Sequence, residues 1–111
     1  MGYRWIKIAA SIEELPQAPL SEIQAGNKTI CLARHNEQLF ACAEKCPHAG
    51  GKMANGYIDA VGNIVCPLHR YKFSLENGRN VSGEGYFLRH FPIEVRPDGV
   101  FVGLKENIWG F

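Results

Sequence analysis

Two short stretches, "CPHAGG" beginning at Cys46 and "CPLHRY" beginning at Cys66, decide how this sequence is interpreted. Each stretch places a histidine close behind a cysteine, because His48 follows Cys46 by two residues and His69 follows Cys66 by three. The interval between the two motifs, residues 49–65, is 17 residues long. What lies in this interval determines whether the four side chains can meet.

The interval contains a predicted β-hairpin at residues 57–66, in which "NGYIDA" and "NIVC" are short strand-like runs around a turn. A hairpin returns the chain to the edge of the sheet from which it started. The two motifs are therefore expected on neighbouring loops at one end of a sheet. Two thiolates and two imidazoles would then converge on one point.

Two kinds of metal site use two cysteines and two histidines. A structural zinc site usually combines a C-x2-4-C turn with a separate H-x3-5-H pair on a helix, and the sequence shows neither. Here each loop contributes one sulfur and one nitrogen. This mixture suits a two-iron cluster in which both sulfurs bind one iron and both nitrogens bind the other. A zinc-stabilised binding module without electron transfer stays open as the alternative.

The motifs "CPHAGG" and "CPLHRYKF" resemble the cluster-binding signature of Rieske-type [2Fe-2S] ferredoxins, and the similarity extends over about residues 30–104. The resemblance implies one [2Fe-2S] cluster per chain. It also implies that Cys46 and Cys66 bind the buried iron, whereas His48 and His69 bind the outer iron near the surface. The stretch "SGEGYF" at residues 82–87 resembles the third loop that covers the cluster in this family.

By resemblance, the residues at four positions predict the low-potential, soluble branch of the family. Two histidines in place of two thiolates make the oxidised centre neutral, which raises its potential relative to all-cysteine clusters. High-potential members raise it further with a serine and a tyrosine, but Tyr71 and Phe73 occupy those positions here. The two cysteines of their bracing disulfide are replaced by Gly51 and Leu68. We expect a midpoint potential of about −150 mV, at the low end of the family's range.

The fold class is predicted as all-β, because 12 glycines punctuate short apolar runs and no helical period is present. The resemblance implies the Rieske fold, an antiparallel β-sandwich or barrel that carries a cluster-binding subdomain of two loops. The expected elements are a strand at 3–10, a helical turn at 12–15, and hairpins at 28–44, 57–66 and 87–104.

The first hairpin contains two further cysteines, Cys31 and Cys42. With a tight turn at His35 and Asn36, they are expected to be diagonal neighbours and to act as buried thiols in place of a disulfide. His35 itself is expected to be exposed in this turn. His90 is expected on the surface of a strand.

Length and charge limit the remaining possibilities. With 111 residues, the chain is expected to form one domain over 1–111, whose cluster-binding part spans about 44–87. Its 12 basic and 11 acidic residues are scattered, so neither nucleic acid nor a membrane is an expected partner. The start lacks the apolar run of a secretory signal, and we expect a cytoplasmic monomer.

These features together favour a one-electron carrier. The sequence has no G-x-G-x-x-G motif after a strand and no second domain to hold a catalytic iron, so it is not expected to catalyse a reaction alone. By resemblance, it would pass electrons transiently from a flavoprotein reductase to a terminal oxygenase or another redox enzyme. The alternative within redox chemistry is the Rieske-like small subunit of an assimilatory nitrite reductase.

Overall fold

The computed structural model describes residues 2–48 and 50–105, and their regular structure consists of ten strands and two short 3-10 helices. The all-β prediction is therefore confirmed. The elements are β1 (Tyr3–Ala9), η1 (Ile12–Glu14), β2 (Leu20–Ala25), β3 (Lys28–His35), β4 (Gln38–Ala43), η2 (Met53–Asn55), β5 (Tyr57–Ile58), β6 (Asn63–Val65), β7 (Lys72–Ser74), β8 (His90–Phe91), β9 (Ile93–Arg96) and β10 (Gly99–Lys105).

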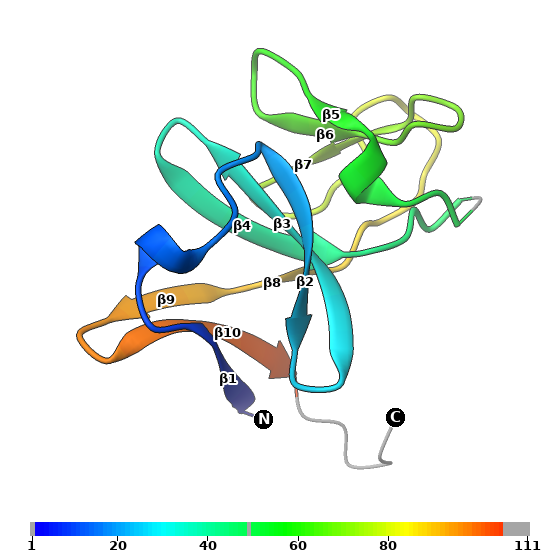
Figure 1. The fold of residues 1–111 in the computed structure, drawn as a ribbon. Coiled ribbons are helices and arrows are strands. Elements are labelled where there is room, and N and C mark those ends of the chain that lie inside the picture. Colours follow the sequence, from blue (N-terminus) through cyan, green and yellow to red (C-terminus); the bar gives the residue numbers. More distant parts are fainter. Residues whose placement is uncertain (1, 49, 106–111) are drawn as a thin grey trace.

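The strands form three antiparallel sheets, with the orders β1-β10-β9, β2-β3-β4-β8 and β5-β6-β7. Figure 1 shows the small β5-β6-β7 sheet at one end of the molecule, above the two larger sheets, while β1 begins at the opposite end. The two predicted cysteine and histidine motifs belong to the part of the chain around this small sheet.

The β2-β3-β4-β8 sheet is the middle layer, and strand β3 shows this most clearly. Because side chains alternate along a strand, Ile30 and Leu32 point to one face and Cys31 and Ala33 to the other. Ile30 and Leu32 pack with valines of β10, whereas Cys31 and Ala33 pack with apolar residues of β6 and β7. Strand β3 is thus buried on both sides, which explains its continuous apolar run.

The turn between β3 and β4 corrects one prediction. It consists of Asn36 and Glu37, both with positive φ (51° and 64°), as in the two-residue turns that suit hairpins. The expected turn was one residue earlier. Because of this shift, Cys31 and Cys42 lie directly opposite each other and are not diagonal neighbours. His35 is a half-buried strand end and not an exposed turn residue.

Two strands were not predicted from the sequence, and one of them shapes the site. Strand β2 pairs with β3 along its whole length, and β7 pairs with β6. The connection from β6 to β7 is the loop at residues 66–71, so the second motif forms the tip of a hairpin. The first motif also lies at the tip of a closed loop, because Lys45 before it and Lys52 after it form one antiparallel β-bridge with each other.

Candidate metal centre

The loop at residues 46–51 has a backbone that folds back on itself at Cys46. The N–H of Cys46 donates to the carbonyl oxygen of Gly51 (2.8 Å), and the N–H of Gly50 donates to the carbonyl oxygen of Cys46 (3.0 Å). Gly50 has a φ of 73°, in the left-handed region that glycine adopts without strain. Six residues between two bridged positions therefore close a tight loop that begins with a cysteine.

The loop at residues 66–71 repeats this arrangement. The N–H of Cys66 donates to the carbonyl oxygen of Tyr71 (2.9 Å), and the N–H of Arg70 donates to the carbonyl oxygen of Cys66 (3.0 Å). Arg70 stands where the first loop has a glycine, and its φ of 62° costs about 1–2 kcal/mol for a residue with a side chain. Equivalent backbones thus present Cys46 and Cys66 at equivalent positions.

The two loop cysteines point into the protein. Cys46 is 3% exposed and Cys66 is 1% exposed, and both belong to the buried cluster that contains Met53, Ile64 and Phe73. Phe73 itself is fully buried and pairs with Ile64 across β6 and β7, so this position serves the core. Water is excluded from both sulfur atoms, as in metal sites where an apolar shell limits the access of solvent.

The two histidines meet at the surface of the protein. The Nδ1 atoms of His48 and His69 lie 3.2 Å apart, and their ring centroids are separated by 4.8 Å. His48 is half-buried and His69 is exposed. The structure therefore brings the predicted imidazoles together with the same nitrogen of each ring facing one point.

Two tyrosines pack against His48, which no pattern in the sequence predicted. The Tyr71 ring stacks on His48 with centroids 4.3 Å apart and an interplanar angle of 24°, and its hydroxyl lies 3.4 Å from Nε2. The Tyr86 ring lies 5.3 Å from the same imidazole. Loss of hydration raises the pKa of Tyr71, and the nearby carboxylate of Glu84 adds to the shift. Tyr71 therefore stays a neutral phenol that holds one face of His48.

The segment that carries Tyr86 is tied to β7 by the side chain of Asn80. The Asn80 amide donates to the carbonyl oxygen of Lys72 (3.1 Å) and to the Glu84 carboxylate (2.9 Å), and it accepts hydrogen bonds from the N–H groups of Glu84 and Gly85. The hydroxyl of Ser82 also donates to Glu84 and thereby lowers the pKa of that carboxyl. We call the surface formed by His48 and His69 the histidine edge. The third loop suggested by the resemblance, residues 82–87, lies against this edge through Tyr86.

The basic residues near the loops are partly neutralised by carboxylates. Lys52 lies 3.7 Å from Glu22, and Lys72 lies 4.0 Å from Asp59. The pKa of Asp59 is lowered mainly by the backbone N–H of Asn63, which donates to its carboxylate. These pairs offset part of the positive charge of Lys52 and Lys72.

The other two cysteines have a different environment. Cys31 and Cys42 are buried, no disulfide joins them, and they share a side-chain hydrogen bond. This hydrogen bond and burial raise the pKa of Cys42 well above the ordinary thiol value. A thiol that keeps its proton is a poor metal ligand, so the expectation that these residues act as small hydrophobic side chains agrees with their setting.

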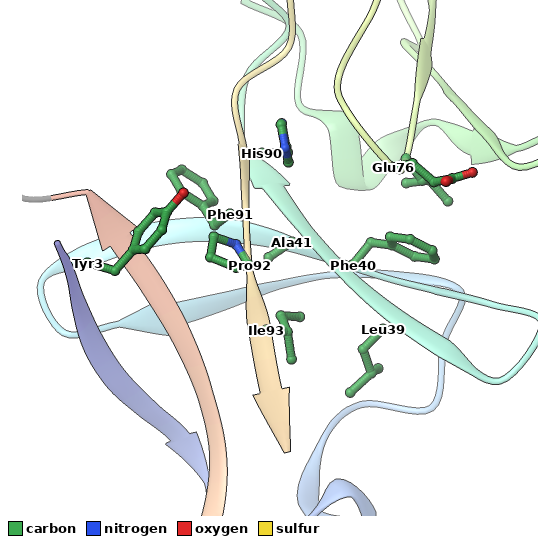
Figure 2. Close-up of a pocket in the computed structure, with 10 residues that line it drawn as sticks. Tyr3, Leu39, Phe40, Ala41, Glu76, His90, Phe91, Pro92 and Ile93 are labelled. Atoms are coloured by element: carbon green, nitrogen blue, oxygen red, sulfur yellow. The ribbon is translucent and has the colours of Figure 1, made fainter. Parts of the chain in front are cut away.

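A hollow of about 280 Å³ is lined by residues of β4, of the segment 90–93 and of the start of β1. Figure 2 shows that Tyr3, Phe40, Phe91 and Pro92 contribute to its wall, with His90 at its upper end. His90 is exposed on its strand, as predicted. None of the four predicted ligands lines this hollow, which is therefore separate from the histidine edge.

The donor set fits a two-iron cluster with unequal ligands. Two soft sulfurs lie inside and two imidazole nitrogens lie outside, so each iron of a pair would receive two protein ligands. Within residues 2–48 and 50–105, no group of three or more His, Cys, Asp or Glu side chains is placed to hold one metal ion.

A family model described as the Rieske [2Fe-2S] domain matches residues 4–86, which is most of the chain. The chain belongs to this family. A [2Fe-2S] cluster is accordingly the cofactor of this Rieske protein. No helix in the described parts of this Rieske chain has the length and hydrophobicity to cross a bilayer.

Ferredoxin components of oxygenase systems are similar to this chain over nearly its whole length. The ferredoxin component of the alkene monooxygenase system of Xanthobacter autotrophicus is 24% identical over 95 residues, which cover 86% of this chain and 78% of that protein. The ferredoxin component of the naphthalene 1,2-dioxygenase system of Pseudomonas aeruginosa is 23% identical over 106 residues, which cover 95% of this chain and 100% of that protein.

Solved structures confirm the Rieske fold. The ferredoxin of carbazole 1,9a-dioxygenase from Nocardioides aromaticivorans has a TM-score of 0.77 at 19% identity and covers 91% of this chain and 98% of its own. A structure described as a putative NADH-dependent nitrite reductase small subunit from Mycobacterium tuberculosis has a TM-score of 0.78 at 18% identity, covering 96% of this chain and 98% of its own. A further carbazole dioxygenase ferredoxin, in complex with its oxygenase, has a TM-score of 0.74 at 24% identity and covers 94% of this chain and 96% of its own.

Proposed function

We propose that this Rieske protein is a one-electron carrier whose cluster is held by Cys46 and Cys66 on one iron and by His48 and His69 on the other. The observation that carries this proposal is the opposite placement of the two donor types, with sulfurs buried and the two Nδ1 atoms 3.2 Å apart at the surface. We further propose that residues 1–111 form one domain, with its cluster-binding part at about 44–87.

The surrounding residues support transfer at the histidine edge. The bound cluster supplies reversible storage of one electron. His69 is exposed and gives a partner the shortest approach, whereas Tyr71 and Tyr86 hold the ring of His48 in place. The burial of both thiols keeps water from the sulfur side. Electron transfer then needs only a brief encounter over a small interface.

The proposed partners follow from the relatives. Ferredoxin components of oxygenase systems are similar to this chain, and one structural neighbour was solved in complex with its oxygenase. We therefore propose a flavoprotein reductase as the donor and a terminal oxygenase as the acceptor, with the chain acting as a cytoplasmic monomer.

The test uses protein purified without oxygen. Iron and acid-labile sulfide should be equimolar at two of each per chain, the visible bands should bleach with dithionite, and the reduced form should give the EPR signal of mixed histidine and cysteine ligation. The dithionite-reduced protein should then reduce a purified terminal oxygenase of a Rieske dioxygenase system. A colourless protein with stoichiometric zinc would refute the proposal.

The structural likeness to a nitrite reductase small subunit favours one second candidate. In that role the chain would be a permanent subunit of a larger enzyme. Affinity purification from the native cell distinguishes the two, because a permanent subunit brings a large siroheme protein with it in a fixed ratio. A carrier elutes alone at the size of a monomer.

A further inference from the structure

Gly51 lies at the point where the two ligand loops touch. An ideal Cβ built on Gly51 would be 2.8 Å from Cγ and 2.9 Å from Cδ1 of Leu68, and 3.3 Å from Sγ of Cys66. The leucine side chain of the second loop therefore packs directly on the glycine backbone of the first. The Cys66 sulfur lies beside this contact.

Leu68 covers Gly51, which lies next to the Cys66 sulfur. The leucine is 52% exposed, so one side of its side chain faces water while the other contacts Gly51. Gly51 is buried beneath it, and Cys66 is only 1% exposed. Gly51 has no positive φ, so its backbone does not require glycine. What requires glycine here is the space that Leu68 occupies.

We propose that Gly51 and Leu68 form an interloop contact that keeps water from the sulfur of Cys66 and thereby lowers the reduction potential of the cluster. The inference rests on the proposed ligand set, in which Cys66 binds iron. Both residues act through Cys66 and are positioning residues. Reduction adds negative charge that is shared with the sulfurs, and nearby water stabilises this charge. Excluding water therefore makes the cluster harder to reduce.

The first test truncates the leucine. In the holoprotein, Leu68→Ala should raise the midpoint potential, increasing the equilibrium constant for reduction by about threefold, on a scale where tenfold corresponds to about 59 mV for one electron. Leu68→Met keeps the apolar bulk, so its potential should stay at the wild-type value. A raised potential in Leu68→Met equal to that of Leu68→Ala would overturn the shielding role.

The second test adds the methyl group that the contact excludes. In Gly51→Ala the new methyl meets Leu68 at 2.8 Å, and this half-exposed side chain can swing into solvent. The potential should therefore rise as it does in Leu68→Ala. In the double variant the leucine that the Gly51→Ala change displaces is already absent, so both changes remove the same shield. The shift of the double variant should be clearly smaller than the sum of the two single shifts, and an additive result would contradict the contact.

A control separates this inference from the proposed function. Val61, 81% exposed in the turn between β5 and β6, gives a matched apolar truncation away from Gly51, and Val61→Ala should leave the potential unchanged. Visible and EPR spectra are recorded for every variant. If the wild-type spectrum lacks mixed ligation, the proposed function fails. If all spectra show it and the potential of Leu68→Ala does not move, only the interloop contact fails.

Discussion

The four cysteines fall into two pairs that share one buried cluster but differ in backbone setting. Cys31 and Cys42 lie within strands, directly opposite each other, and share a hydrogen bond. Cys46 and Cys66 begin six-residue loops closed by equivalent backbone hydrogen bonds, and a histidine follows each. Burial is common to both pairs, so burial alone does not distinguish the proposed ligands from the other two cysteines. What differs is the backbone, because the proposed ligands begin loops and the other two cysteines lie in paired strands.

Removing one sulfur from each pair gives the largest expected contrast. Cys66→Ser should abolish the cluster, because the buried iron loses one of its two thiolates, and iron per chain should fall close to zero. Cys31→Ala should keep the full iron content and the wild-type visible spectrum. Iron and sulfide assays on both purified variants make the comparison. Loss of iron in Cys31→Ala alone would reverse the assignment of the pairs.

A substitution of Phe73 tests whether the buried hydrophobic cluster that contains all four cysteines stabilises the protein. Phe73 is fully buried among both cysteine pairs, so Phe73→Ala should lower the free energy of unfolding by about 3–5 kcal/mol. Urea unfolding followed by the visible bands gives the value. Val95→Ala on β9, where valine is 58% exposed, should change it by less than about 0.5 kcal/mol. Equal effects would show that the cluster of buried residues does not support the site.

Cys42, which lies within a strand, should resist alkylation at a pH at which an ordinary thiol reacts. Because the pKa of Cys42 is raised in the folded protein, its thiol keeps its proton near pH 8.5, the ordinary thiol pKa. Its contribution to stability is complete below that pH and declines as pH rises further, since the unfolded chain loses the proton first. Iodoacetamide at pH 8.5 followed by peptide mass spectrometry should label Cys42 only after unfolding. Labelling of the native protein would contradict this.

Substitution of Arg70 has the smallest expected effect on stability, and it compares the backbones of the two ligand loops. Arg70→Gly would match the glycine of the first loop and relieve the left-handed strain, which should stabilise the protein by about 1 kcal/mol. Arg70→Ala removes the same charge but keeps a Cβ, so it should lack this gain. Thermal unfolding of the two variants measures the difference. Equal stabilities would mean that the loop tolerates Arg70 without strain.

The sequence predicted the elements whose signals are local. The hairpin at 28–44 and the motif loops were recognisable from apolar runs, turn residues and cysteine spacing. Strand β2 was missed although Gly26 and Asn27, a two-residue turn signal, separate it from β3. Strand β7 was missed because its three residues are held by pairing with β6 and by backbone hydrogen bonds to residues 79–81, which lie outside the strand itself.

The sequence predicted four donors and one covering loop, but not the side chains that pack around His48. Cysteine and histidine spacing predicted the donors, and their role stays a prediction. The resemblance placed residues 82–87 over the site without indicating that the Tyr86 ring reaches His48. The register of Cys31 and Cys42 was wrong by one position at the turn, and this alone changed diagonal neighbours into a direct pair. Such contacts depend on the meeting of distant segments, which neither spacing nor composition encodes.

The two-faced burial of β3 restricts how the chain can vary. One residue inserted in this strand would rotate every later side chain to the opposite layer, so that Ile30 and Leu32 would exchange surroundings with Cys31 and Ala33. The packing on both faces of β3 would be lost at the same time, in the core next to the ligand loops and in the core next to β10. Length changes among relatives should therefore fall in the connections and spare this strand.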